Sequence, residues 1–312
     1  MIDPRFFDIR YIKLHFSVSF KEDSALPRNK TSALRGGMGE MLLRSCCVKN
    51  RKCETCEFES ECVVRRIMYS KMEIQPSFMT SGDSVGYVIE CEDYREEVKE
   101  GDILRFNLLL FGKTIVYFSQ ILNAFYALGM NGIGKEKGRF CIESVTNTKN
   151  VPILQGNDVL MENYEILRVS DYISYRKEQI KRKPLENGIR FISPLSVKYR
   201  GKPLDRFILE ALIESACRRI YMLDCFEGIE SSIHDLEYVE SIQVPDVISE
   251  YHKNISFKRY SNHKESAMYL KGIEGEMKLE SINNDLLDIL LAGELIHLGK
   301  NTSFGFGRYQ LF

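Results

Sequence analysis

Residues 298–309 read Leu-Gly-Lys-Asn-Thr-Ser-Phe-Gly-Phe-Gly-Arg-Tyr, and residues 128–140 read Leu-Gly-Met-Asn-Gly-Ile-Gly-Lys-Glu-Lys-Gly-Arg-Phe. Both stretches share the frame Leu-Gly-x-Asn, then a glycine-bearing spacer, then Gly-Arg-aromatic. Glycine turns between a helix and a strand are common, but the same frame in each half of a chain favours an internal duplication. The sequence therefore predicts one folding unit that occurs twice.

The elements around the two stretches occur in the same order. In the first half, β-branched and aromatic runs and a helical apolar stripe predict a strand at 9–20, a helix around 34–42, strands at 85–90 and 103–111, a helix at 114–128 and a strand at 139–145. In the second half, the expected elements are a strand at 188–197, a helix at 204–226, a hairpin of 256–261 with 270–279, a helix at 283–297 and a strand at 304–311. This β-α-β-β-α-β order predicts an α+β fold with two tandem ferredoxin-like (RRM-like) domains and a small metal-binding insert in the first.

The predicted domains are residues 1–180, with a Cys-rich insert at about 46–66, and residues 185–312, which end in the glycine-rich loop. The charge run and proline of residues 181–184, Lys-Arg-Lys-Pro, interrupt any helix between them.

Composition is that of a soluble globular chain, with 312 residues, 44% hydrophobic and 28% charged. No apolar run is long enough to span a membrane, and the N-terminus lacks a signal-peptide pattern, so we expect a cytoplasmic protein. The net charge of −1 hides an uneven distribution. Residues 176–202 carry nine basic residues against two acidic ones, a net charge of +7. One face of the protein could therefore be basic, although helix faces that differ in sign would give the same count.

The glycine-rich loop, residues 299–309, has the chemistry to bind a phosphate backbone. Glycine has no Cβ, so backbone amides beside it can approach a phosphate, while basic and hydroxyl side chains add charge and donors. The RNA-binding residues expected here are Gly299, Lys300, Asn301, Thr302, Ser303, Gly305, Gly307 and Arg308. The same composition suits a tight helix-to-strand turn.

A cysteine cluster predicts a metal site. The spacing Cys47-x5-Cys53-x2-Cys56-x5-Cys62 gathers four thiols in one charged loop, as tetrahedral structural zinc sites do. Cys46 could replace Cys47, and an iron–sulfur cluster would use the same ligands. Four thiolates leave no open coordination position, so a structural zinc is expected and no catalytic metal.

The loop Gly-Lys-x-Thr-x-Phe-Gly-x-Gly-x-Tyr resembles the signature of CRISPR-associated endoribonucleases of the repeat-associated mysterious protein (RAMP) superfamily. Residues 34–39, Leu-Arg-Gly-Gly-Met-Gly, resemble the start of the family's first helix, and the cysteine segment resembles an insert of one branch. The resemblance covers nearly the whole chain. It implies cleavage of precursor CRISPR RNA within its repeats.

Metal-independent RNA cleavage needs a base for the ribose 2′-OH, an acid for the leaving oxygen and a cation for the developing charge. Relatives often have a histidine close to the first helix, and this chain has none there; His15 lies within the first strand. The hairpin segment 258–264 supplies the candidates instead. The catalytic residues expected there are His263, Tyr260 and Lys264, with Arg259 as an RNA contact. Lys30 and Arg35, at the start of the first helix, are further phosphate contacts.

These observations predict an endoribonuclease that cuts CRISPR repeat RNA to a 2′,3′-cyclic phosphate and a 5′-OH. Two other classes are considered. One is a non-catalytic RAMP subunit that binds CRISPR RNA among other CRISPR-associated effector subunits, which the missing helix-proximal histidine favours. The other is a zinc-stapled protein-interaction module without an RNA role.

Overall fold

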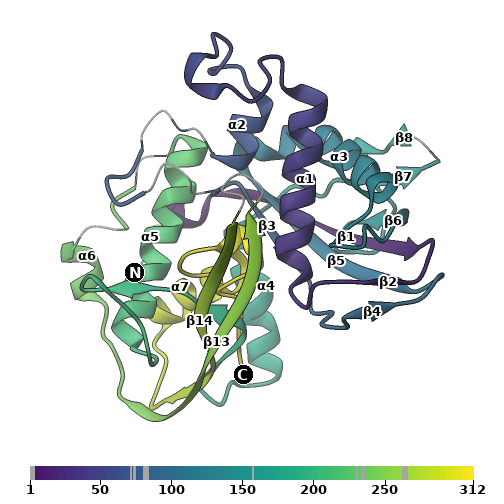
Figure 1. The fold of residues 1–312 in the computed structure, drawn as a ribbon. Coiled ribbons are helices and arrows are strands. Elements are labelled where there is room, and N and C mark those ends of the chain that lie inside the picture. The colour runs from purple at the N-terminus through teal and green to yellow at the C-terminus, as the bar shows by residue number, and fades with distance from the viewer. Residues whose placement is uncertain are drawn as a thin grey trace. The chain divides into compact units, whose positions relative to one another are not determined.

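The structure is a computed structural model that describes residues 4–70, 72, 75–79, 84–156, 158–229, 231–233, 236–261 and 266–312. It divides the chain into two compact units (Figure 1). The N-terminal unit comprises Tyr11–Glu73 and Ser77–Ile166, and the C-terminal unit comprises Met1–Arg10, Ile74–Pro76 and Leu167–Phe312.

The N-terminal unit is a ferredoxin-like fold. Its main elements are β1 (Arg10–Phe20), α1 (Lys30–Cys46), β3 (Tyr87–Glu90), β5 (Ile103–Phe111), α3 (Phe118–Asn131) and β6 (Phe140–Thr146). The strands pair antiparallel in the order β3-β5-β1-β6. The sequence therefore runs β-α-β-β-α-β, as predicted.

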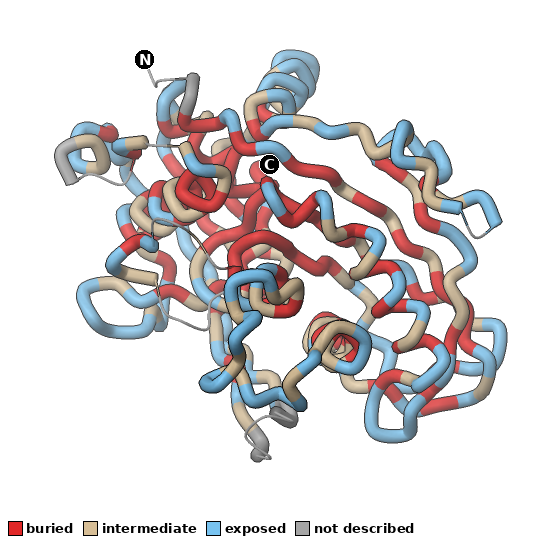
Figure 2. Tube along the Cα trace, turned by 90° about the horizontal axis from the view of Figure 1, so that it is seen from above, coloured by how far each residue is buried: buried red, intermediate tan, exposed pale blue. Residues whose placement is uncertain are grey.

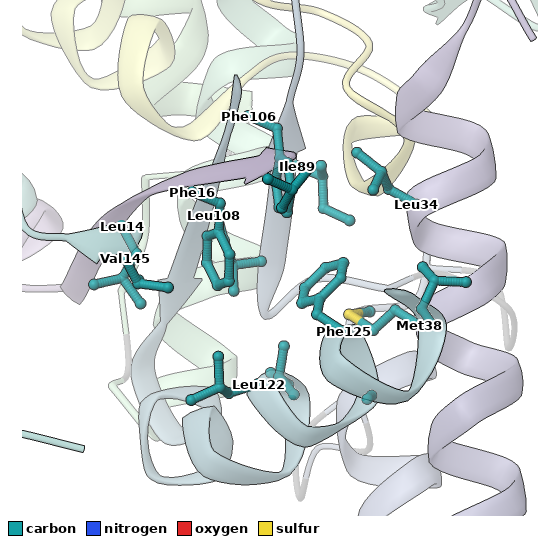
Figure 3. Packing of buried hydrophobic residues seen from close by; sticks show 14 of the residues in the cluster. Leu14, Phe16, Leu34, Met38, Ile89, Phe106, Leu108, Leu122, Phe125 and Val145 are labelled. Carbon is teal, nitrogen blue, oxygen red and sulfur yellow. The ribbon is translucent and has the colours of Figure 1, made fainter. Parts of the chain in front are cut away.

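The core of this unit lies between the sheet and the two helices α1 and α3 (Figure 3). Alternate residues of β1 face it, because successive side chains of a strand point to opposite sides. Phe16 stacks on Phe106 of β5 with ring centroids 4.8 Å apart, and Phe125 of α3 lies 5.4 Å from Phe16. Leu34 and Met38 of α1 complete the layer and are fully buried.

The C-terminal unit repeats this topology. Its main elements are β10 (Gly188–Leu195), α5 (Leu209–Glu227), β13 (Val247–Ser261), β14 (Ser266–Leu279), α7 (Asn284–Ile296) and β15 (Tyr309–Leu311). The strand order β13-β14-β10-β15 is that of the first unit, with corresponding strands in corresponding places. The predicted α+β class and the two ferredoxin-like folds are confirmed.

A buried carboxylate ties α4 (Val169–Arg182) to this unit. Glu294 of α7 is 6% exposed. It accepts hydrogen bonds from Arg176 Nε at 2.8 Å, from the Tyr172 hydroxyl at 3.0 Å and from the Leu311 amide at 2.6 Å. A carboxylate buried at this depth requires such partners. They explain why α4 belongs to the C-terminal unit, whereas the sequence-based boundary places residues up to 180 in the first domain.

Shorter elements complete the two units. They are η1 (Pro4–Phe7), β2 (Ser24–Ala25), η2 (Cys53–Thr55), α2 (Val63–Met68), β4 (Glu97–Val98), η3 (Gly112–Tyr117), β7 (Leu154–Gln155), β8 (Asp158–Val159), η4 (Met161–Asn163), β9 (Leu167–Arg168), β11 (Lys198–Tyr199), β12 (Lys202–Pro203), α6 (Leu236–Ser241) and η5 (Thr302–Phe304). Buried residues follow the strands and the inner faces of the helices, and exposed residues gather in the loops (Figure 2). In the described part of the chain, no helix is long and apolar enough to cross a membrane.

Two strand boundaries differ clearly from the predictions. β13 begins at Val247, nine residues before the predicted start, because its first half is exposed and carries polar residues that hide the strand pattern. The last strand begins at Tyr309 and not at residue 304, because Gly305 and Gly307 have φ angles of 78° and 75°. A backbone in that region cannot continue a strand.

Candidate RNA interface

The glycine-rich loop is a closed turn that connects α7 to β15. Gly299 and Gly307 have φ angles of 78° and 75°, a region that favours glycine. A Cβ on Gly307 would lie 1.8 Å from the Leu298 carbonyl oxygen, and one on Gly299 would lie 2.4 Å from the Ser196 carbonyl oxygen. The loop therefore needs these glycines for its own packing against the chain.

Several backbone amides of this loop donate hydrogen bonds to acceptors within the protein. The Lys300 amide donates to Ser196 O at 2.7 Å, and the Gly307 amide donates to Pro194 O at 2.9 Å. The Gly305 amide donates to Thr302 O at 2.8 Å, and the Arg308 amide donates to Ser193 Oγ at 2.9 Å. These four amides are not directed at a phosphate.

The side chains of the glycine-rich loop differ in exposure. Thr302 and Ser303 are buried, at 5% and 4% exposed. Asn301 and Arg308 are half-buried, and Lys300 is exposed. Gly299, Gly305, Gly307, Thr302 and Ser303 thus have packing roles within the protein, and their phosphate contacts stay a prediction, while the Lys300 side chain is exposed.

The turn has a counterpart in the N-terminal unit. Gly132 ends α3 with φ 82° and ψ 155°, and His297 ends α7 with φ 61° and ψ 155°. The following residue then pairs with the later glycine, Ile133 with Gly138 and Leu298 with Gly307. The Gly-Arg-aromatic part of the repeated frame thus falls on equivalent turns. The Leu-Gly-x-Asn part does not, because its first copy lies inside α3 and its second copy follows α7.

A basic turn, residues 198–202, lies beside the glycine-rich loop. It joins β11 to β12, and its Lys198, Arg200 and Lys202 side chains are exposed. The Arg200 guanidinium lies 5.1 Å from the ring centroid of Tyr199. The hydrogen bond from Lys300 to Ser196 brings a fourth cation next to this turn. Arg176 of the same basic segment is less available, since it pairs with buried Glu294.

The β13–β14 hairpin carries two lysines and a tyrosine on one exposed face. Lys258 is the cross-strand partner of Tyr269, and Ser256 is the partner of Lys271. All four residues are exposed, Tyr269 at 60%. We call this set the hairpin platform. Exposed aromatic rings between cations are the arrangement with which proteins bind single-stranded nucleic acid, by stacking on bases and pairing with phosphates.

Glycines shape the hairpin so that this face is open. Gly272 lies against β10, where a Cβ would be 2.6 Å from the Leu195 carbonyl oxygen, and Gly275 has a φ of 145°. Ile273 is buried on one side of β14, and Leu270 is buried on the other. The strand therefore changes its buried face around Gly272, and the platform residues Tyr269 and Lys271 lie beyond that point with exposed side chains.

The predicted catalytic residues fall between Tyr260 and Lys264 in the sequence, at the edge of the described part of β13. His263 and Lys264 fall outside the described residues. Arg259 and Tyr260 lie in β13, but their side chains are likewise outside the description. Their roles remain predictions. Sequence reasoning missed Tyr269 and Lys271, although a tyrosine and a lysine two residues apart on a strand share a face and could have been noticed.

The structure corrects the role predicted for Lys30. Its side chain is buried, donates to the Arg95 carbonyl oxygen and lies 3.7 Å from Asp93 Oδ1. Burial lowers the pKa of the Lys30 ammonium. It is therefore not placed to bind an RNA phosphate. Arg35 is half-buried, and its Nη2 donates to Ser84 Oγ at 3.0 Å.

The four predicted metal ligands lie in one segment between α1 and α2. The thiols of Cys47, Cys56 and Cys62 are near enough to Cys53 to raise its pKa electrostatically, after the larger effect of burial. The Cys47 thiol instead accepts a hydrogen bond from the Arg51 amide at 3.2 Å, which lowers its pKa. Among the described residues no set of three or more His, Cys, Asp or Glu side chains has the arrangement of a metal site. The segment thus gathers the thiols without showing a formed site.

Comparisons with known proteins cover both units. Residues 9–166, just over half of the chain, match the family model AF_1859_N, an N-terminal domain. Residues 189–309 match the model of the CRISPR-associated endoribonuclease Cas6. No curated protein matches the chain.

Solved structures share the fold at low sequence identity. A chain of a partial Cas6-RT-Cas1–Cas2 complex matches with a TM-score of 0.56 and 14% identity over 100% of this chain and 47% of that one. The Cas6 (TTHB231) product complex, of the Thermus thermophilus protein, matches with a TM-score of 0.53 and 12% identity over 97% of this chain and 100% of that one. The chain thus spans about half the length of the first of these relatives. The N-terminal unit thus belongs to the family of the AF_1859_N N-terminal domain, and residues 189–309 of the C-terminal unit are similar to the CRISPR-associated endoribonuclease Cas6.

Proposed function

We propose that this chain binds the repeat of a precursor CRISPR RNA in the cytoplasm and cuts it without a catalytic metal. In this reaction the ribose 2′-OH attacks the adjacent phosphate and leaves a 2′,3′-cyclic phosphate and a 5′-OH. The observation that carries the proposal is the Cas6 family match over residues 189–309. That range contains the basic turn, the hairpin platform and the exposed Lys300.

The exposed cations of the C-terminal unit support RNA binding in spite of the net charge of −1. Lys198, Arg200 and Lys202 project from a turn, where they can neutralise phosphates and release counterions. Tyr269 on the hairpin platform offers a ring on which a base can stack. This combination suits a single-stranded or loop region of RNA better than a protein partner.

His263, Tyr260 and Lys264 remain our proposal for the hairpin end, on the chemical ground that an imidazole, a phenol and an ammonium can supply base, acid and cation. The cysteine segment is proposed to hold a structural zinc, since four thiolates can stabilise a loop that has no apolar core of its own.

The test uses the cognate repeat RNA at saturating protein concentration in excess EDTA. Cleavage within the repeat supports the proposal. RNA that is bound but never cut would contradict the enzymatic part and favour a non-catalytic subunit that holds CRISPR RNA among other effector subunits. This second function, RNA binding without cleavage, is favoured by one observation, that α1 contains no histidine.

A further inference from the structure

A hydrogen-bonded chain of polar side chains lies on the sheet face of the N-terminal unit that points away from the core. On β1, Leu14 and Phe16 face the core, so Lys13 and His15 face the opposite side. His15 pairs in register with Asn107 of β5 and with Thr146 of β6. The imidazole therefore sits in the middle of the sheet and is half-buried.

The bonding of this chain fixes which imidazole nitrogen carries the proton. Glu90 is a carboxylate that can only accept, and Lys13 Nζ lies 2.9 Å from its Oε2. Asn107 must therefore turn its amide nitrogen toward Glu90, at 2.8 Å, and its Oδ1 toward His15. Because Oδ1 only accepts, His15 Nδ1 must donate to it, at 2.7 Å. In the neutral ring, Nε2 then bears the lone pair.

The burial of Glu90 lowers the folding stability of the protein, so a functional role would explain why the arrangement is present. The Glu90 side chain is 3% exposed, and burying a charge in a sheet is expensive even when it is paired. A base oriented through a second residue by a buried carboxylate is the pattern of many proton-transfer sites. The other described histidines differ, since His297 is fully buried and His252 bonds to Glu250, two residues away on the same strand, at 2.6 Å and packs edge-on against the Phe207 ring.

The same face carries the other groups that an RNA backbone needs. Arg105 is exposed two residues before Asn107 on β5, so it shares the face of the imidazole, and its register partner is Ser17. Thr146 faces His15 from β6. The charged groups on this face near the imidazole are thus Lys13, Arg105 and Glu90, and Glu90 is linked to His15 through Asn107.

We propose that His15, and not His263, is the catalytic base that removes the 2′-OH proton of the RNA, with Asn107 as its positioning residue. This inference rests on the proposed function. The 2′-OH proton passes to His15 Nε2, the 2′ oxygen forms a bond to phosphorus, and the bond from phosphorus to the 5′ oxygen breaks. The leaving oxygen takes a proton from solvent. Glu90, acting through Asn107, balances the charge on the imidazolium, and Arg105 binds the phosphate.

The test compares His15→Ala with the wild-type chain in single-turnover cleavage of the cognate repeat RNA, at saturating protein in EDTA. The rate constant should fall by about 100-fold or more, as for loss of a general base, with the dissociation constant for RNA unchanged. Added imidazole should restore part of the rate. His252→Ala is the matched control, since it also removes a carboxylate-bonded imidazole from a strand, and it should cut at the wild-type rate.

Asn107→Ala distinguishes positioning from a purely structural role. Without Asn107 the His15 Nδ1–H loses its acceptor and the ring loses its fixed orientation, so the single-turnover rate constant should fall while the dissociation constant for RNA stays unchanged. A wild-type rate in His15→Ala would overturn the inference, as would a rate lost together with RNA affinity and not restored by imidazole. If the wild-type chain itself does not cut RNA, the proposed function fails and this inference falls with it; if only His15→Ala keeps full activity, the inference alone fails.

Discussion

Replacing Gly307 with alanine tests whether the glycine-rich loop is a structural turn. Its φ of 75° costs an L-residue roughly 1–2 kcal/mol. The new Cβ would lie 1.8 Å from the Leu298 carbonyl oxygen, so the backbone must shift. That shift breaks the 3.0 Å hydrogen bond from the Leu298 amide to Gly307 O, worth about 1 kcal/mol. The expected loss of unfolding free energy is therefore about 3 kcal/mol.

Gly201→Ala is the matched control in the same unit. Gly201 has a similar φ of 80°, but a Cβ there would meet nothing within 4 Å. Its substitution should cost only this backbone part, about 1–2 kcal/mol. Urea unfolding of the two variants, followed by circular dichroism, measures the difference. Equal losses would refute the packing explanation, and a Gly307→Ala variant of full stability but weakened RNA binding would return the loop to a phosphate-binding role.

Three further predictions concern binding, pH and metal. Tyr269→Ala should weaken RNA binding by about 1–3 kcal/mol. Lys258→Ala should reduce the salt dependence of binding by about one counterion, as measured in filter-binding titrations. Lys253, whose ammonium lies 3.3 Å from Glu274, is the control, and Lys253→Ala should change these titrations little if the hairpin platform is the contact surface. Burial raises the pKa of the Asp224 carboxyl from 3.8 to about 8, so the folded state keeps this proton at pH values where the unfolded chain has lost it. The free energy of unfolding should therefore fall by up to about 1.4 kcal/mol per pH unit as the pH rises from about 4 to about 8. Asp224→Asn should flatten that slope in unfolding experiments, and an unchanged slope would show that Asp224 is not its source. Purified protein should contain about one zinc per chain by elemental analysis, lost in Cys53→Ser; a metal-free wild-type chain would contradict the zinc proposal.

The fold was largely predictable because its signals are local. The alternation of apolar residues on the strand from Ile103 to Phe111 gives that element its observed bounds, and the stripe through Leu34 and Met38 marks the first helix. The order of elements then fixes the ferredoxin-like topology in both halves. The exposed first half of β13 was not predictable in this way, since an edge strand that buries little has no clear hydrophobic period.

The candidate site was less predictable, because composition does not show which groups the fold uses for itself. The glycines at 299 and 307 look the same in sequence whether they face a phosphate or the carbonyl oxygens of Ser196 and Leu298. Lys30 precedes a helix as a phosphate ligand would, yet tertiary packing buries it beside Asp93. The link from Glu90 through Asn107 to His15 joins three strands, and only strand register brings those residues together.

The central claim is that the ribose 2′-OH of the repeat RNA is the nucleophile. Once the cut position is mapped with the wild-type chain in EDTA, a repeat RNA with a single 2′-deoxy nucleotide immediately 5′ of that position tests the claim most directly. The account predicts that this RNA binds with unchanged affinity and is not cut, while the all-ribose RNA yields a 2′,3′-cyclic phosphate and a 5′-OH. Cleavage of the 2′-deoxy RNA at the same position would contradict it.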